Sequence, residues 1–404
     1  MNTAIPVRLS ERLNTPISTT ELERRWKAVR AAMERDKIDV LLMQNNNDHM
    51  GGYVRYFTDV PATNGYPITA VFPRDDLMTI VMHGGFGMAQ NIAPGGNGIL
   101  RGVKTVLGTP SFACAPYTFG YDPELAAKAL APYADGTIGL VSTYQMSFAM
   151  VDNLKRGGFS NTRFVEATDL VDTIKAIKSK EEMQRIRDCA RMQDGAMKAA
   201  FAALKPGMKD SEVAAAARYY SHVYGSEQGI YMCNSAAPGE PAKHAPSHFQ
   251  NRTIREGDTL ALLVEDNGPG GYYAELGRLC VVGKASEQLK DEFAFALEAR
   301  RFTLNMLQPG TPCRDIWHAY NDFMRHNGRP PEDRVYCHGQ GYDLVERPLI
   351  RHDETMAIER NTNLACHPGF IRNGCFAWIC DNYVLGETGS FERIHAFPET
   401  ITEI

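Results

Sequence analysis

The sequence predicts a two-domain chain of the mixed α/β (α+β) class, and three observations carry that prediction. Short apolar runs alternate with helical stretches over residues 1–170, which is typical of an α/β layer. Two long helical stretches in residues 171–404 each end at Leu-x-Pro-Gly, which indicates an internal repeat. Two strand-like runs over 257–282 flank a glycine-rich turn and predict a β-hairpin. We therefore expect one domain at 1–170 and a second at 171–404.

Local signals place the elements of the first domain. Ser18 and Glu21 have the spacing of a capping box ahead of apolar residues at helical intervals, which predicts a helix over 18–35. The run Ile38–Met43 is typical of a buried strand. Further strands are expected at 70–72, 78–82 and 139–141, and a helix near 145–157.

The second domain begins with a helical stretch over 169–203 that stops at Lys205-Pro206-Gly207. The same Leu-x-Pro-Gly stop recurs at Leu307, after a second predicted helix over 286–307. In both copies an acidic and an aliphatic residue then begin another helix. A duplicated helix–loop–helix–strand unit predicts a pseudo-twofold domain with a site between its halves.

The predicted hairpin carries the first candidate site residues. Its first strand ends in two carboxylates, Glu265 and Asp266, and its second strand contains Glu275. Strand side chains alternate between faces, so only one of the first two shares a face with Glu275, and the spacing leaves open which. Buried carboxylates are costly unless they meet a metal ion, a cation or hydrogen-bond donors. We therefore interpret this hairpin as part of a site rather than as a solvated turn.

Composition excludes several classes of function. The formal net charge is −5 and basic runs are short, which argues against a nucleic-acid partner. No apolar run approaches the ~18 residues of a membrane span, so no membrane partner is expected. The N-terminus lacks the apolar segment of a secretory signal, and nine cysteines without Cys-x-x-Cys pairs are typical of reduced thiols. We expect a cytoplasmic protein.

Several motifs occur in one order along 170–390. They are Ile-Lys-Ser-Lys-Glu-Glu before the long helix, the two Leu-x-Pro-Gly repeats, Gly257-Asp258 opening the hairpin, Gly271-Tyr-x-x-acid-x-x-Arg closing it, His338-Gly-Gln-Gly with Glu346 and Pro348, and His367-Pro-Gly. In this combination the chain resembles the creatinase / aminopeptidase P / methionine aminopeptidase superfamily. The resemblance implies a creatinase-like amino-terminal domain and a carboxy-terminal pita-bread catalytic domain.

The resemblance also implies a ligand pattern from which this chain departs. Metallopeptidases of the superfamily hold two metal ions with Asp, Asp, His, Glu and Glu. Carried across, these positions are Leu263 (or, one residue on, Val264), Glu275, His338, His367 and Cys380. An aliphatic side chain cannot ligate a metal, and loss of a bridging carboxylate removes a two-metal site. On this basis we expect no metal cofactor and no dinuclear centre, and the pattern argues against a metallopeptidase.

Creatinase-like members of the superfamily, which have lost these ligands, supply the functional hypothesis. It is a hydrolase that cleaves a C–N bond, other than an ordinary peptide bond, in a small polar or zwitterionic metabolite. The expected catalytic residues, acting by acid–base chemistry, are His338, His367, Glu265, Glu275 and His248.

The superfamily also has a histidine shortly before the hairpin that contacts substrate. His248 and His244 compete for this position, and we prefer His248 as the catalytic residue. Further expected substrate contacts are His244, Arg347, Cys380, and Tyr66 donated by a partner subunit from the segment 63–67. This arrangement implies a homodimer with the site near the subunit interface. Arg278 is expected to pair with a carboxylate and to serve the structure.

Three alternatives stay open. A single zinc or iron ion could be held by Glu275, His338, His367 and Cys380, which are acceptable ligand types. The reaction could be that of a lyase, because sulfonium lyases occur in this fold. Finally, the chain could be a non-catalytic pita-bread binding protein, although it lacks the charged tails of such members.

Overall fold

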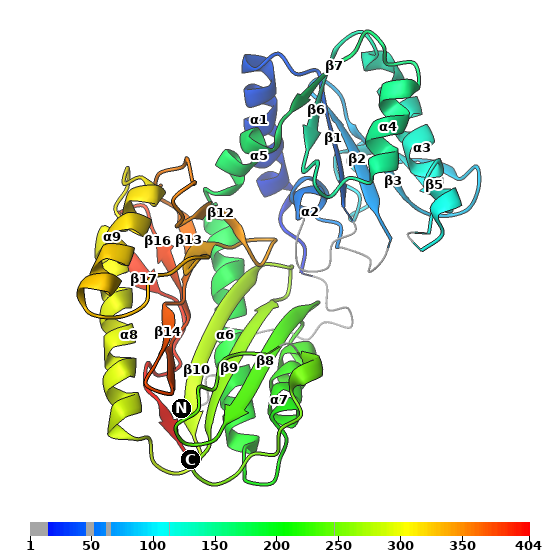
Figure 1. Ribbon diagram of the computed structural model, residues 1–404. Coiled ribbons are helices and arrows are strands. Elements are labelled where there is room, and N and C mark those ends of the chain that lie inside the picture. Colours follow the sequence, from blue (N-terminus) through cyan, green and yellow to red (C-terminus); the bar gives the residue numbers. More distant parts are fainter. Residues whose placement is uncertain (1–14, 46–51, 62–65, 113, 246) are drawn as a thin grey trace. The chain divides into compact units, whose positions relative to one another are not determined.

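The computed structural model describes residues 15–45, 52–61, 66–112, 114–245 and 247–404 (Figure 1). Two compact units follow one another along the chain, Pro16–Lys175 and a unit that contains Ala176–Ile404. Helix α5 (Thr168–Lys175) closes the first unit, where it contacts α1 (Thr19–Arg35). The limits 1–170 and 171–404 stay our proposal for the functional domains.

The amino-terminal unit is a seven-stranded sheet with helices. Its strand order is β4-β5-β3-β2-β1-β6-β7, and β1 pairs antiparallel with β2 and parallel with β6. Ser18 caps α1 by accepting a hydrogen bond from the Glu21 amide at 3.1 Å, which confirms the predicted helix start. The remaining elements are β1 (Val40–Asn45), α2 (Tyr53–Thr58), β2 (Ile68–Pro73), β3 (Met78–His83), β4 (Ala89–Asn91), β5 (Val103–Thr109), α3 (Tyr121–Leu130), β6 (Thr137–Val141), α4 (Phe148–Arg156) and β7 (Arg163–Glu166).

The carboxy-terminal unit repeats one arrangement twice, as the sequence predicts. In each half two helices pack on an antiparallel sheet (Figure 1). The first half consists of α6 (Lys180–Ala203), α7 (Asp210–Val223), β8 (Gly229–Ala236), β9 (Thr259–Asn267) and β10 (Tyr273–Val281). The second consists of α8 (Glu287–Met306), α9 (Cys313–His326), β11 (Cys337–Gly339), β12 (Glu346–Leu349), β13 (Thr362–Cys366), β16 (Asp381–Leu385) and β17 (Phe391–Arg393). A short hairpin, β14 (Gly369–Arg372) with β15 (Cys375–Trp378), and β18 (Thr402–Glu403), which pairs with β10, complete the unit.

Helix boundaries in this unit follow from the local chemistry of the chain. Ser179 and Glu182 form a complete capping box at the start of α6, so two otherwise unsatisfied amides find acceptors. At the other end α6 stops before Leu204, whose backbone leaves the helical conformation ahead of Pro206. Apolar side chains of α6 and α7 then pack on β8, β9 and β10, which builds the core of the first half.

The register of the β9–β10 hairpin answers the question that the sequence leaves open. Glu265 lies directly opposite Glu275, and Asp266 lies opposite Ala274. Direct partners in an antiparallel pair project from the same face, so Glu265 and Glu275 face the same way. Asp266 projects from the opposite face toward α6 and accepts hydrogen bonds from Gln193 at 2.8 Å and from the Tyr231 hydroxyl at 2.6 Å. The hairpin therefore separates its two neighbouring carboxylates.

Over the part of the chain that the structure describes, no helix is both long enough and apolar enough to cross a membrane.

Candidate active site

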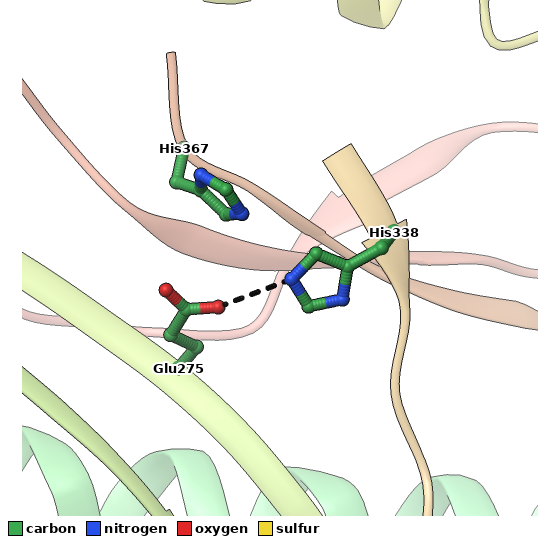
Figure 2. A group of neighbouring side chains, drawn as sticks. All are labelled: Glu275, His338 and His367. Carbon is green, nitrogen blue, oxygen red and sulfur yellow. Dashed lines mark ion pairs between the residues drawn. The ribbon is translucent and has the colours of Figure 1, made fainter. Parts of the chain in front are cut away.

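Three metal-ligating side chains from three elements converge in the carboxy-terminal unit. Glu275 comes from β10, His338 from β11, and His367 from the residue that follows β13. One ligand atom of each lies within 4.8 Å of the others, and Figure 2 shows the three side chains turned toward one another. Nε2 of His338 lies 3.5 Å from Oε2 of Glu275, and the two imidazole rings are 5.1 Å apart. The three donors are buried or half-buried.

Strand pairing explains why the two histidines meet. Strands β11 and β13 are antiparallel neighbours, with Cys337 opposite Cys366, so His338 and His367 lie on opposite sides of that pair and are diagonal neighbours on one face. Nδ1 of His338 lies 3.0 Å from the Gly339 carbonyl oxygen. Because a carbonyl oxygen only accepts, the proton is on Nδ1 and the lone pair of the neutral ring is on Nε2, toward Glu275. The backbone thus selects the tautomer that a metal ion requires.

The facing atoms fit a cation. The lone pair on Nε2 of His338 and the carboxylate oxygen of Glu275 repel each other unless a proton or a metal ion lies between them. Among the described residues Oε2 of Glu275 is buried and has no hydrogen-bond partner. Burying a carboxylate oxygen without a hydrogen-bond partner costs free energy, and a metal ion or another positive group beside Oε2 would offset that cost.

The protonation states of these groups also fit a metal ion. Burial alone would raise the pKa of the Glu275 carboxyl, but the imidazoles of His367 and His338, when they carry a proton, outweigh it and lower that pKa to about 2. Burial lowers the pKa of the His367 imidazole to about 4, although Glu275 acts in the opposite direction. Near neutral pH the set therefore contains an ionised carboxylate and a neutral imidazole, which are the forms that bind a divalent ion.

Glu265 and Cys380 flank this group without belonging to it. Burial, and then the neighbouring Glu275, raise the pKa of Glu265 well above its ordinary value. Oε1 of Glu265 accepts a hydrogen bond from Nε2 of Gln340 at 3.1 Å. The Cys380 thiol donates to the backbone oxygen of Glu275 at 3.5 Å, and burial raises its pKa well above the usual range. A protonated thiol is not a metal ligand, so the ligand role expected of Cys380 stays a prediction without support from this contact.

The two competing histidines before the hairpin have different surroundings. The ring of His244 lies edge-on to Trp378, with centroids 4.2 Å apart, and its Nε2 is buried without a hydrogen-bond partner in the described part of the chain. Burial lowers the pKa of His244 to about 4, and the charge of Glu275 counteracts this. His248 is exposed and lies against Phe249. The structure therefore brings His244 to the site and leaves His248 outside it, and a catalytic role for either stays a prediction.

The expected substrate contacts Tyr66 and Arg347 both have contacts inside their own unit. The ring of Tyr66 packs on His83, with centroids 4.3 Å apart, and residues 63–65 of its segment lie outside the described residues. The guanidinium of Arg347 binds Glu354, with Nε 3.1 Å from Oε2, so its charge already anchors a loop. Roles for Tyr66 and Arg347 in substrate binding stay predictions.

Arg278 has the structural role that the sequence predicts. It is fully buried and binds the Asp381 carboxylate at 2.7 Å. It also donates to the backbone oxygens of Gly277 and Cys380.

Sequence reasoning missed the buried amides around the carboxylates. Asn382 accepts a hydrogen bond from the Glu275 amide at 2.6 Å and donates to Gln340 at 2.8 Å. Gln340 occurs in the His338-Gly-Gln-Gly motif, but the motif alone assigned it no role. A polar Asn382 in a fully buried strand was the signal available, because a buried amide needs partners.

Comparison with known proteins identifies the family. Residues 184–387 match metallopeptidase family M24. The chain belongs to this family. This result confirms the superfamily resemblance and the fold class predicted from the motifs.

Individual relatives agree with the assignment. The chain is 27% identical to an Xaa-Pro dipeptidase of Pyrococcus furiosus over 236 residues, which are 55% of this chain and 63% of that protein. It is 25% identical to an uncharacterized hydrolase/peptidase, y4tL, of Sinorhizobium fredii over 95% of both chains. Among solved structures, a prolidase from Thermococcus sibiricus has a TM-score of 0.76 at 18% identity and covers 96% of this chain and 100% of its own. That likeness shows the fold.

Two expectations from the sequence are wrong. The prediction of a C–N hydrolase that does not act on ordinary peptides conflicts with membership in a metallopeptidase family and with relatives that are Xaa-Pro dipeptidases. The prediction of no metal cofactor conflicts with the same family and with the convergence of Glu275, His338 and His367. The error has a physical cause: Leu263 removes a ligand of a two-metal site, but the three donors that converge are enough to hold one ion, which is an alternative that the sequence leaves open.

Proposed function

We propose that this protein is a metal-dependent hydrolase that cleaves the peptide bond of short peptides, with Xaa-Pro dipeptides as the first substrates to test. The observation that carries the proposal is the buried group of Glu275, His338 and His367, in which a carboxylate oxygen lacks a hydrogen-bond partner among the described residues. Membership in the metallopeptidase family and the names of the relatives support the choice of peptides.

The donor set fits one divalent ion, zinc or iron. Two imidazoles and one carboxylate are a common set for catalytic zinc and for iron centres with open positions. Glu275, His338 and His367 would hold the ion. When bound, such an ion supplies Lewis acidity, which polarises a carbonyl group and makes water more acidic.

The surrounding residues supply proton transfer and shape. Burial and Glu275 raise the pKa of Glu265, so this carboxyl group retains a proton at higher pH than usual and can donate it to a leaving amine. His244 has a buried Nε2, without a hydrogen-bond partner among the described residues, with which to bind a polar substrate group, and Trp378 and Phe376 pack on its ring.

A lyase on the same donor set is the second candidate, because two histidines and one carboxylate also suit iron. Hydrolysis incorporates oxygen from labelled water into the product, whereas elimination gives an unsaturated product without the label. Mass spectrometry of the products separates the two reactions.

The proposal includes a homodimeric assembly and a cytoplasmic location. We expect a homodimer with the site near the subunit interface, and light scattering of the purified protein tests it. The nine cysteines are all free thiols, which supports our expectation of a reducing cytoplasm.

The experiment begins with elemental analysis of protein purified without chelator. We expect zinc or iron at one ion per chain, cleavage of at least one Xaa-Pro dipeptide, and loss of activity after chelation that the metal restores. A protein that holds no metal and gains no activity from zinc, iron, manganese or cobalt contradicts the proposal.

A further inference from the structure

A chain of buried amides connects the backbone of Glu275 to the carboxylate of Glu265. Its first member is Asn382, whose Oδ1 accepts the Glu275 amide at 2.6 Å. A backbone N–H can only donate, so this contact identifies the oxygen of the Asn382 side chain. The Nδ2 of Asn382 must therefore point the other way, toward Gln340 and Asn363, at 2.8 and 3.1 Å.

The orientation of Asn382 determines that of Gln340. Because Nδ2 of Asn382 donates, the atom of Gln340 that faces it is the oxygen Oε1. Nε2 of Gln340 then faces Oε1 of Glu265 at 3.1 Å and the Leu344 carbonyl oxygen at 2.9 Å. A reversed amide would place nitrogen against the Nδ2 of Asn382 and oxygen against the Leu344 carbonyl oxygen. The buried Gln340 therefore has one orientation, with a donor aimed at Glu265.

The Nε2 donor of Gln340 occupies one carboxylate oxygen of Glu265, and this affects how many metal ions the site can hold. Glu265 is the direct cross-strand partner of Glu275 and projects from the same face, so it is the carboxylate best placed to join a second cation beside Glu275. It is nevertheless absent from the group of converging donors in the described chain. One of its oxygens is already bound to an N–H, and a hydrogen-bond donor next to a carboxylate opposes the approach of a cation to that oxygen.

We propose, on the basis of the function proposed above, that Gln340 is a positioning residue that retains Glu265 as a hydrogen-bonded carboxyl group and thereby limits the centre to a single metal ion. A neutral amide donor would thus replace a second cation as the partner of Glu265. The Cys380 thiol also agrees with a single ion, because it donates a hydrogen bond to the backbone oxygen of Glu275 and a protonated thiol is not a metal ligand.

The test measures metal stoichiometry in the full-length protein by equilibrium dialysis against zinc or manganese, followed by elemental analysis. The wild type is expected to bind one ion per chain. Gln340→Glu replaces the donor with a carboxylate beside Glu265 and is expected to bind two. Gln340→Met removes the donor at similar volume and covers the case in which the extra buried charge prevents folding of the first variant. It is expected to bind a second, weaker ion.

The chain offers a matched control on the other face of the same hairpin. Gln193 donates to Asp266 at 2.8 Å, as Gln340 does to Glu265, but away from the metal-binding group. Gln193→Met should leave the stoichiometry at one ion.

The outcomes separate the two proposals. A wild type without metal contradicts the proposed function. A wild type with two ions contradicts the role of Gln340 and leaves metal-dependent hydrolysis in place. One ion in the wild type and in every folded Gln340 variant also contradicts the role of Gln340, whereas a second ion in a folded Gln340 variant alone supports it.

Discussion

Glu275 is the residue on which the candidate metal-binding group depends. It contributes the negative charge, and its Oε2 is the buried oxygen without a hydrogen-bond partner in the described residues. Glu275→Gln preserves the shape but removes the charge. We expect zinc affinity to fall at least about 100-fold, because loss of a residue that only hydrogen-bonds to a ligand already costs about 10- to 100-fold. Isothermal titration calorimetry measures it.

Glu265→Gln is the matched control for that variant, because it makes the same change on the cross-strand neighbour. Its zinc affinity should stay within several-fold of the wild type. Equal losses in both variants would show that Glu265 is itself a ligand.

Asp266 predicts a pH dependence of stability. Burial raises its pKa from 3.8 to about 6, although Gln193 and Tyr231 donate hydrogen bonds to it. Between these two pH values the folded protein binds a proton that the unfolded chain has released, so the stability from Asp266 is lost as pH rises from about 4 to about 6. A shift of this size corresponds to about 3 kcal/mol. Asp266→Asn removes this dependence.

Urea unfolding at several pH values between 4 and 7 measures the effect. The free energy of unfolding of Asp266→Asn relative to the wild type should increase by about 3 kcal/mol across that interval. Parallel pH profiles for the two proteins would show that Asp266 titrates normally.

At the scale of elements, the hairpin and the β14–β15 pair meet closely at a glycine. A Cβ added to Gly277 would lie 1.9 Å from Cη2 of Trp378, whose ring packs on His244. Gly277→Ala must therefore displace the indole, at a cost of about 1–3 kcal/mol in unfolding free energy. We expect a lower melting temperature and an altered near-ultraviolet dichroism spectrum. Gly386→Ala is the control, because nothing lies within 4 Å of its added Cβ, and a fall as large in this variant would contradict the packing argument.

The loop before β9 carries His244 and His248, which differ in burial. His244→Gln is expected to lower kcat/KM for the best-cleaved dipeptide by about 5- to 10-fold, because it replaces the imidazole proposed to bind a polar substrate group, and a lost hydrogen bond costs about 1 to 1.5 kcal/mol. His248→Gln should retain activity close to the wild type, because that side chain is exposed and lies on Phe249. Steady-state kinetics on both variants measures these effects. A larger loss of activity in His248→Gln than in His244→Gln would support His248, the residue preferred from the sequence.

At the scale of the whole molecule, the metal should stabilise one unit only. All three donors belong to the unit that contains Ala176–Ile404, and none belongs to Pro16–Lys175. At a metal concentration of 100 times Kd, binding adds about 2.7 kcal/mol to the stability of the unit that binds it. Hydrogen exchange should therefore slow in β10, β11 and β13 and stay unchanged in β1, β2 and β3. Equal protection of both units would contradict this separation.

By itself the sequence determined the features that depend on local pattern. The capping residue Ser18 starts its helix, and the two Leu-x-Pro-Gly stops mark the repeat, whereas the stretch expected as one helix over 169–203 is divided into α5 and α6 at residues 176–179. The motifs around Glu275, His338 and His367 identified the superfamily, and the alternative single-ion set drawn from them contained these three donors together with Cys380. These are signals that a few neighbouring residues contain, because capping and helix termination act over single turns.

Only the tertiary structure decided how these residues meet. Strand register placed Glu265 rather than Asp266 opposite Glu275, and packing placed His244 against Trp378 while His248 stays exposed. The expectation of a metal-free site failed for the same reason, since residue spacing recorded a lost carboxylate but not the distance among the remaining donors. Register and side-chain packing depend on contacts between segments far apart in the chain, and no local pattern contains them.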